Sequence, residues 1–367
     1  MSQATDLPKL RRGWTTGTCA AAAARAAYEA LLTGEFPDPV SVLLPAGARP
    51  AFALALQERG SDFARAGIVK DAGDDPDVTH GAVILATVRL GPAGSGVVFR
   101  AGAGVGTVTR AGLPLPPGEP AINPVPRAMI RAAIAEVAAL HRAAGDVVVE
   151  ISIPGGEKIA ERTLNGRLGI VGGLSILGTT GIVVPYSCAA WIHSIHRGID
   201  VARGMGLDHV AGSTGNTSEA AVQKLHALHE VALIDMGDFV GGMLKYLRRH
   251  PVAKVTIAGG MGKMTKLGQG LLDLHSRRGD VDLGWLATRA LEAGGSNELA
   301  ARVRDANTAK EAFELADAAG IDVAARVAEA AWATAAKALH DGDIALETVI
   351  FDRTGQLLAR APFRRVH

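Results

Sequence analysis

Carboxylates, a lysine and a histidine are crowded into residues 70–80, KDAGDDPDVTH. Carboxylates this close together repel one another and shift each other's pKa, so one of them could act as a general base or as a polar clamp in a cleft. Their spacing does not fit a regular calcium-binding loop. A solvated acidic loop is the alternative interpretation, because surface loops commonly gather charge.

A second group of charges lies between residues 259 and 280, where His275 accompanies four cations. Adjacent arginines can bind carboxylates through paired hydrogen bonds, so this region could receive a polyanionic substrate or could be a solvated loop end. The run at 259–265 is not a Walker A loop, because Ile257 and Met264 stand where that loop needs glycine and a hydroxyl. The four cations are Lys263, Lys266, Arg277 and Arg278.

Residues 164–187, LNGRLGIVGGLSILGTTGIVVPYS, are rich in glycine, and no charged residue stands between Leu168 and Ile192. Polar residues, dense glycine and a terminal proline argue against a membrane span. One interpretation is a buried strand-turn-strand with no chemistry of its own. The other is that the Gly-Thr-Thr-Gly turn at 178–181 borders a bound ligand, because glycine lets the backbone approach closely.

Threonines at 15–18 precede an alanine-rich run that predicts a helix from about residue 19 to 33, ended by Gly34. These threonines either cap the helix or, with its free N–H groups, form an anion site. Glycines at 102–106 follow a strand, but the prolines after them exclude the helix that a dinucleotide fingerprint requires.

From residue 189 the sequence alternates short strands, glycine-rich turns and helices, which predicts a parallel sheet with ligands at the carboxyl ends of its strands. The turn at 212–216, GSTGN, follows the first strand, and Asp235 and Asp238 follow the second. Such a pattern suits an adenosyl ligand, since the backbone must come close and an acid binds the ribose hydroxyls. A turn of this kind with no ligand stays open as the alternative.

The composition is that of an ordinary globular protein, with 48% hydrophobic and 20% charged residues. A net charge of +1 and 4% aromatic residues give little to attract nucleic acid or an anionic membrane. Cys19 and Cys188 form no CxxC pair, which predicts a reducing compartment and no structural metal site. Because the N-terminal residues lack the apolar core of a signal peptide, we expect a cytoplasmic protein.

Motifs spread over nearly the whole chain resemble the CbiD family of cobalamin biosynthesis. The resemblance implies S-adenosylmethionine (SAM) as methyl donor and cobalt-precorrin-5B as acceptor, methylated at ring carbon C-1 to give cobalt-precorrin-6A. It implies no protein-bound metal, because the cobalt belongs to the substrate. The matching motifs are GWTTGTCAAAAARAA at 13–27, KDAGDDPDVTHGA at 70–82, GVGTVTRAGLPLPPGEPAINPVPR at 104–127, IPGGEKIAERTLNGRLGIVGGLSILGTTGIVVPYS at 153–187, GSTGN at 212–216, GDFVGG at 237–242 and DLHSRR at 273–278.

The resemblance also implies an α/β fold in two domains. Residues 1–190 would form an α+β part that resembles domain two of ribosomal protein S5. Residues 191–367 would form a Rossmann-like, parallel-sheet domain that binds SAM and ends in helices and a hairpin. Partners beyond the small-molecule substrate stay open, whether neighbouring pathway enzymes or a second copy in a homodimer.

Carried onto this sequence, the resemblance assigns roles to the residues above. The expected SAM contacts are Gly212, Gly215 and Asn216, with Asp235 or Asp238 on the ribose. The expected catalytic residues are Thr179 and Thr180, flanked by Gly178 and Gly181 where donor meets macrocycle, and Asp77 and His275, with Asp74 and His80, for proton movements. The expected contacts to the carboxylate arms of the substrate are Lys263, Lys266, Arg277 and Arg278.

Two other functions compete with methyl transfer. A nicotinamide-dependent reductase of the same pathway would need a dinucleotide fingerprint, which neither glycine-rich turn supplies. A non-catalytic tetrapyrrole carrier would leave the glycine and acid pattern of residues 190–280 without a purpose.

Overall fold

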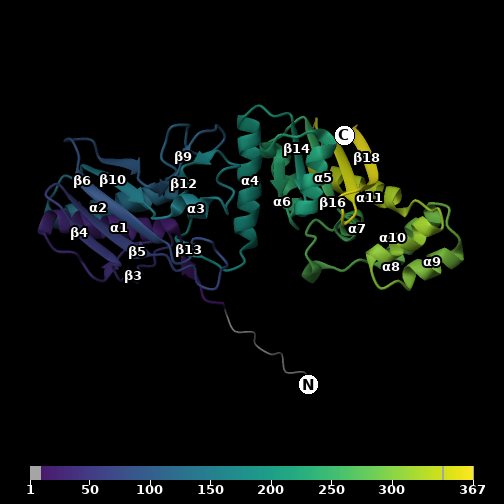
Figure 1. The fold of residues 1–367 in the computed structure, drawn as a ribbon, viewed down its shortest axis with the longest axis horizontal. Helices are drawn as coiled ribbons and strands as arrows, with labels where there is room; N and C mark the ends of the chain where they lie inside the picture. The colour runs from purple at the N-terminus through teal and green to yellow at the C-terminus, as the bar shows by residue number, and fades with distance from the viewer. Residues whose placement is uncertain (1–9, 341–342, 367) are drawn as a thin grey trace, which may run out of the picture. The chain divides into compact units, whose positions relative to one another are not determined.

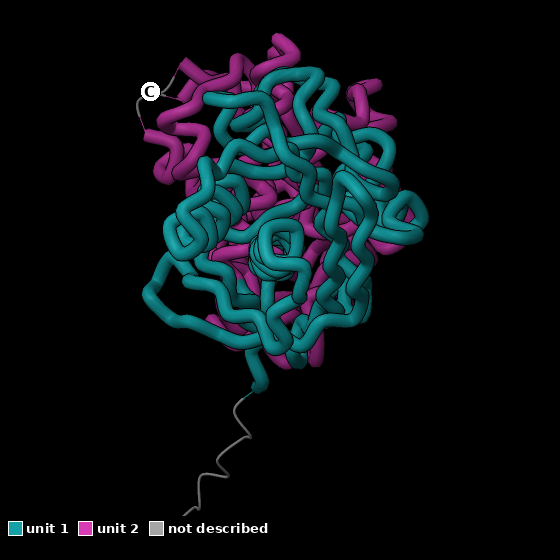
Figure 2. The backbone as a smooth tube through the Cα atoms, turned by 90° about the vertical axis from the view of Figure 1, so that its left-hand side faces the viewer, with its two compact units in different colours: residues 1–187 teal, residues 188–367 magenta. Residues whose placement is uncertain are grey.

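The computed structural model describes residues 10–340 and 343–366 of the chain. The chain divides into two compact units, residues 1–187 and residues 188–367, which we name unit 1 and unit 2 (Figure 2). Both combine helices with sheets, so the protein is of the mixed α/β class. The boundary expected at residue 190 falls inside the first helix of unit 2. Within the described residues, no helix has both the length and the apolar character to cross a membrane.

The main sheet of unit 1 has the strand order β4-β5-β6-β10-β7, antiparallel except where β10 and β7 run parallel (Figure 1). Strand β10 alternates buried Val147, Val149 and Ile151 with partly exposed residues, because successive side chains point to opposite faces of a sheet. The elements of unit 1 are β1 (Gly13–Trp14), α1 (Thr16–Thr33), β2 (Val40–Ser41), β3 (Ala51–Phe52), β4 (Leu56–Arg59), β5 (Phe63–Val69), β6 (Val83–Leu90), β7 (Val97–Ala101), β8 (Gly104–Val105), β9 (Thr107–Val108), α2 (Pro124–His141), β10 (Val147–Ser152), α3 (Gly156–Ala160), β11 (Ile170–Val171), β12 (Gly173–Leu174) and β13 (Ile182–Val183).

Helix α1 packs against β5, β6 and α2, and most of its residues are buried. Its alanines favour the helical state and are small enough to be covered on every side. The Thr15 side chain caps it by accepting a hydrogen bond from the Thr18 N–H, and Gly34 ends it with a φ of 90°. The helix predicted from about residue 19 therefore begins earlier, at Thr16, and ends at Thr33 as expected.

The glycine-rich stretch 164–187, which carries no charge after Arg167, forms short paired segments rather than one long strand. Strand β11 pairs with β9, β12 pairs with β8, and β13 pairs with β1. The run at Ile182–Val183, expected to be a buried strand, is a two-residue strand that is only partly buried. Through β13, the stretch thus pairs with β1, the first strand of unit 1.

The sheet of unit 2 has the order β15-β14-β16-β17-β18, in which β15, β14, β16 and β17 run parallel and β18 is antiparallel to β17. The hairpin expected at the end of the second domain is present as β17 and β18. The elements of unit 2 are α4 (Cys188–Gly204), β14 (His209–Ser213), α5 (Asn216–His226), η1 (Glu230–Ala232), β15 (Leu233–Asp235), α6 (Val240–Leu247), β16 (Lys254–Gly260), α7 (Met261–Gly268), η2 (Ser276–Arg278), α8 (Leu283–Glu292), α9 (Asn297–Arg304), α10 (Ala309–Ala318), α11 (Val323–Leu339), β17 (Ala345–Phe351) and β18 (Leu357–Arg365).

The order of strands reverses at β14, because β15 lies on one side of β14 and β16 on the other, although all three run parallel. Helix α5 covers one face, because Val222 of α5 packs with Ala211 and Val349. Helix α6 covers the opposite face, where a Cβ on Gly212 would meet Met243. In sheets of this kind the crevice at the carboxyl ends of such neighbouring strands is the usual ligand site.

Candidate functional site

A cavity of about 520 Å³ lies in unit 2 at the carboxyl ends of β14, β16 and β17. We name it the strand-end cavity. It is lined by the turn after β14 (214–218), the start of α7 (260–263), the start of α10 (308–310) and the turn after β17 (351–353). The parallel strands β14, β16 and β17 therefore deliver their loops to one place, as a parallel sheet should.

Helices α5, α7 and α10 all begin at the strand-end cavity. The N-cap residues of α5 and α7 are Gly215 and Gly260, which have no side chain to cap the helix. Helix α10 is capped by Thr308, which accepts a hydrogen bond from the Glu311 N–H. The first N–H groups of α5 and α7 therefore lack side-chain acceptors and favour an anion.

The charged side chains around the cavity are mainly cationic. Lys263, Lys266, Lys310 and Arg353 line it together with the single carboxylate of Asp352. The Lys263 ammonium pairs with Asp238 and donates to the Leu274 carbonyl over 3.3 Å. The Lys266 ammonium donates to the same carbonyl over 3.4 Å and is 7% exposed.

The residues expected to bind SAM separate into two groups. Gly215 and Asn216 line the cavity, and a Cβ added to Gly215 would meet nothing within 4 Å. Gly212 is buried in β14, where a Cβ would come within 2.3 Å of Met243 Sδ, so close packing explains this glycine. Asp235 is the last residue of β15 and Asp238 follows the strand; both lie outside the lining, and Asp238 pairs with Lys263.

The residues expected to bind substrate also separate. Lys263 and Lys266 lie in the cavity beside Gly215, whereas Arg277 and Arg278 are exposed in η2 and do not line it. The His275 Nδ1 atom accepts a hydrogen bond from the Arg277 N–H over 3.1 Å and so caps η2. The structure thus brings two of the predicted substrate cations together with predicted SAM contacts.

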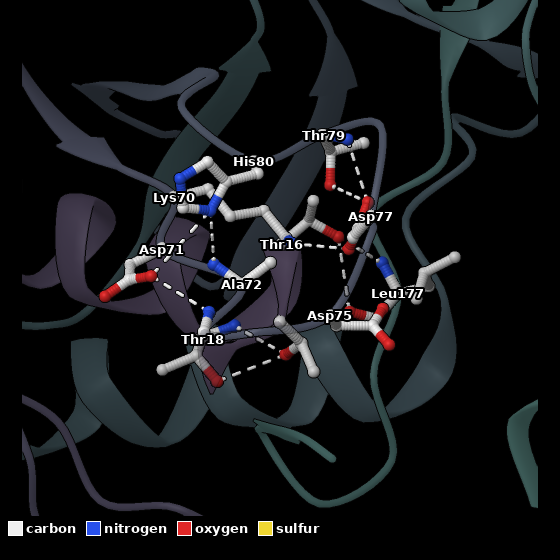
Figure 3. Close-up of polar contacts among 12 residues, drawn as sticks. Thr16, Thr18, Lys70, Asp71, Ala72, Asp75, Asp77, Thr79, His80 and Leu177 are labelled. Carbon is white, nitrogen blue, oxygen red and sulfur yellow. Dashed lines mark hydrogen bonds and ion pairs between the residues drawn. The ribbon is translucent and has the colours of Figure 1, made fainter. Parts of the chain in front are cut away.

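In unit 1, three sequence motifs meet at the N-terminal end of α1 (Figure 3). They are the threonine-rich segment 15–18, the acidic segment 70–80 and the loop 177–181. We name this group the Thr–Asp cluster. Thr16 Oγ1 accepts a hydrogen bond from the Leu177 N–H over 2.9 Å, and Thr18 Oγ1 donates to the Gly181 carbonyl over 2.7 Å. The N-terminal threonines therefore anchor the glycine-threonine loop.

Asp77 is tied to Lys70, the lysine that begins the same acidic motif. Lys70 is 2% exposed, and its Nζ lies 2.6 Å from Asp77 Oδ2. Burial raises the pKa of Asp77, but hydrogen bonds and the positive charge of Lys70, together with Thr79, outweigh it and leave the pKa below its ordinary value. Asp77 is therefore held as a carboxylate in an ion pair.

The other carboxylates of the loop also have partners in the chain. Arg11 pairs with Asp71 and, through its hydrogen bond, lowers the pKa of that carboxyl to about 2. Asp74 accepts from the Arg11 N–H over 2.6 Å, and Asp75 accepts from the Tyr186 N–H over 2.8 Å. Residues 73–78, with His80 and Arg162, line a second cavity of about 450 Å³.

Thr179 and Thr180 are exposed at the edge of the Thr–Asp cluster. Gly178 and Gly181 beneath them are fixed by packing, because a Cβ at Gly178 would come within 2.3 Å of Thr15 Oγ1. The two hydroxyls are thus presented on a firmly anchored loop. They lie in unit 1, as do Asp74, Asp77 and His80, whereas His275 lies in unit 2.

Sequence reasoning missed the contributions of β17 and α10 to the cavity. Lys310, Asp352 and Arg353 come from segments assigned to helices and a hairpin. A signal was present in Asp352, because it follows an apolar strand as Asp235 does. The missing step was to recognise that strand as part of the parallel sheet.

Comparison with known proteins gives consistent results across the chain. The CbiD family model matches residues 3–185, and the model for the CbiD C-terminal domain matches residues 273–362. A crystal structure of the cobalamin biosynthesis protein CbiD from Archaeoglobus fulgidus is 31% identical in sequence, covering 73% of this chain and 83% of that one, with a TM-score of 0.41.

Curated relatives are far more similar in sequence. The cobalt-precorrin-5B C(1)-methyltransferase of Agrobacterium fabrum is 66% identical over 97% of this chain and 94% of its own length. The protein of the same name from Paramagnetospirillum magneticum is 60% identical over 97% of this chain and 99% of its own length. With identities of this size over nearly full length, the chain belongs to the CbiD family.

Proposed function

We propose that the chain is a SAM-dependent methyltransferase that methylates ring carbon C-1 of cobalt-precorrin-5B and yields cobalt-precorrin-6A. The observation that carries this proposal is the 66% identity over nearly the whole length to relatives that bear this enzyme's name. Neither the reductase nor the tetrapyrrole carrier is favoured by these names.

SAM binds, in this proposal, in the strand-end cavity of unit 2. A volume of about 520 Å³ lies within the usual range for sites that hold one small molecule. The open space beside Gly215 lets a ligand approach the backbone at the start of α5. The parallel sheet with its reversal of strand order at β14 supports a Rossmann-like description of unit 2, and the α+β sheet of unit 1 is the proposed S5-like domain.

When bound, SAM supplies an activated methyl group that an electron-rich ring carbon can attack. The protein then has to position the two reactants and exclude water, with no need for a covalent nucleophile. Thr179 and Thr180 are the proposed contacts to the reacting face of the macrocycle. His80, with Asp74, is the proposed proton carrier, because Asp77 is occupied by Lys70.

Substrate carboxylates would meet the exposed cations Arg277 and Arg278. These side chains can reach a large ligand, because both are exposed; Arg278 lies 3.5 Å from a carboxylate oxygen of Asp273. Arginine forks match carboxylate geometry. The cobalt is carried by the substrate, and the proposed location of the enzyme is the cytoplasm.

Calorimetric titration with SAM, S-adenosylhomocysteine (SAH) and NADPH tests the proposal. We expect micromolar-order binding of the adenosyl compounds and none of NADPH. Gly215→Arg should abolish the binding by filling the space at the start of α5. Gly166→Arg is the matched control, because a Cβ there also meets open space but lies in unit 1. Binding of NADPH alone would overturn the proposal in favour of a reductase.

A further inference from the structure

Lys266 is a buried cation that the chain itself does not neutralise. Its side chain leaves α7 toward the interior, with 7% of the residue exposed, and its Nζ hydrogen-bonds the Leu274 carbonyl. Among the described residues, no carboxylate forms an ion pair with Lys266. Its neighbour Lys263 differs, because it pairs with Asp238.

Burying an unpaired ammonium is unfavourable, and buried charges in proteins are paired or bound to ligands. Lys266 lines the strand-end cavity, where α5 and α7 begin without side-chain caps. Both features favour the same kind of ligand group, because helix N-termini also attract negative charge. The anion that completes this site is therefore expected to come from the ligand.

The chemistry of the proposed reaction offers carboxylates from two sources. One is the methionine end of SAM, and the other is the set of acetate and propionate arms of the corrinoid. The cavity volume of about 520 Å³ suits one molecule of SAM size, and the same cavity contains Gly215 and Asn216. These observations favour the methionine carboxylate over an arm of the larger substrate.

We propose that Lys266, together with the first turns of α5 and α7, binds the α-carboxylate of the methionine part of SAM. This inference rests on the proposed function and changes the expected role of Lys266, which the sequence assigned to the substrate arms. A charge-assisted hydrogen bond of this kind fixes one end of the ligand. The sulfonium end is then held at a defined distance from the sheet.

The test compares two ligands and four proteins by isothermal titration calorimetry. The ligands are SAH and its decarboxylated analogue, which differs only in the missing carboxylate. The wild type is expected to bind SAH at least tenfold more tightly than the analogue. Lys266→Met should weaken SAH binding at least tenfold while leaving the affinity for the analogue within twofold.

Lys254→Met is the matched control, since Lys254 is a lysine of unit 2 that pairs with Asp208 and does not line the cavity. Its affinities for both ligands should stay within twofold of the wild type. Lys266→Arg, which keeps the charge, should retain the preference for SAH.

Three results would overturn the inference. If the wild type binds SAH and the analogue equally well, no carboxylate site exists, whether or not Lys266→Met folds. If Lys266→Met leaves SAH affinity unchanged or weakens both ligands equally, the carboxylate lies elsewhere and the proposed function stands. If the wild type binds no adenosyl compound, the proposed function and the inference both fail.

Discussion

The Thr–Asp cluster of unit 1 and the strand-end cavity of unit 2 use polar groups in opposite ways. In the cluster, Asp71, Asp74, Asp75 and Asp77 each accept a hydrogen bond from the chain itself. In the cavity, the first N–H groups of two helices lack side-chain caps, and Lys266 has no carboxylate partner among the described residues. The carboxylates of the cluster thus have hydrogen-bond donors within the chain, whereas the cavity has donors without side-chain or carboxylate partners.

This difference suits the cluster to stabilising the fold and the cavity to binding a ligand. A closed network stabilises loops, and each of its members resists change because removing one leaves another unpaired. A surplus of donors around a cavity favours a ligand that supplies the acceptors. The exposed groups of the cluster, which are the hydroxyls of Thr179 and Thr180 and the side chains of Asp74 and His80, are then the ones proposed to act in the reaction, since the buried Lys70 is already paired with Asp77.

The largest effect is expected for Lys70→Met in the Thr–Asp cluster. Removing the ammonium leaves Asp77 without its ion-pair partner, and breaking a buried pair in this way costs about 3 kcal/mol of unfolding free energy. Urea denaturation, monitored by hydrogen exchange of the α1 amides, measures the loss of unfolding free energy. SAH affinity should stay within twofold of the wild type, because the cavity lies in unit 2.

The double variant Lys70→Met with Asp77→Asn is the control for this prediction. It removes both charges and should recover more than half of the lost stability. No recovery, or a tenfold loss of SAH affinity in the single variant, would contradict the contrast between the two regions.

The two regions also differ in how much of their structure could be predicted from the sequence. The cap at Thr15, the alanine-rich run and Gly34 predict α1 because these signals are local. The alternation of strands and helices likewise predicts the parallel sheet and places Gly215 and Asn216 at its carboxyl edge. Local patterns of this kind survive into the fold almost unchanged.

Pairing between distant residues could not be predicted from the sequence. Lys70 and Asp77 lie in one motif, but nothing local indicates that Lys70 is buried. Gly212 looks like a ligand-binding glycine until the sulfur of Met243 is placed beside it. Lys266 looks like a surface cation, because its burial depends on how α7 packs against the segment around Leu274.

Thr179→Val tests whether the exposed hydroxyls of the cluster act in the proposed reaction. We expect turnover to fall about tenfold, which corresponds to about 1.4 kcal/mol of activation free energy. SAH affinity and the unfolding midpoint should not change, because the side chain is exposed. Thr288→Val, an exposed threonine on α8, is the control and should retain full turnover. An unchanged rate in Thr179→Val would remove the loop from the active site.

Thr18→Val probes the buried side of the same loop. Thr18 Oγ1 donates to the Gly181 carbonyl over 2.7 Å, and the side chain is fully buried. Losing this hydrogen bond should lower the unfolding free energy by about 1 kcal/mol. Thr18→Ser, which keeps the hydroxyl, should lose less. If Thr18→Val and Thr179→Val destabilise unit 1 equally, the distinction between buried anchors and exposed contacts is wrong.

The smallest effect concerns a closed polar network near the amino ends of the strands of unit 2. His209 Nε2 lies 2.9 Å from Thr256 Oγ1, which donates to the buried Glu347. Burial, together with the charges of His226 and Lys254, lowers the pKa of His209 to about 4, although Asp208 opposes the shift. This network is as complete as the Thr–Asp cluster, although it belongs to the sheet that carries the cavity.

A histidine whose pKa is lower in the folded state binds its proton more readily when unfolded. The stability that its neutral form provides is present above pH 6.5 and is lost as the pH falls toward 4. Because His209 is only partly buried, we expect less than about 1 kcal/mol between pH 7 and 5. His209→Gln should remove this part of the pH dependence in urea titrations while keeping the hydrogen bond to Thr256. An unchanged pH dependence in that variant would mean that other groups carry it and that the network is not closed around a neutral histidine.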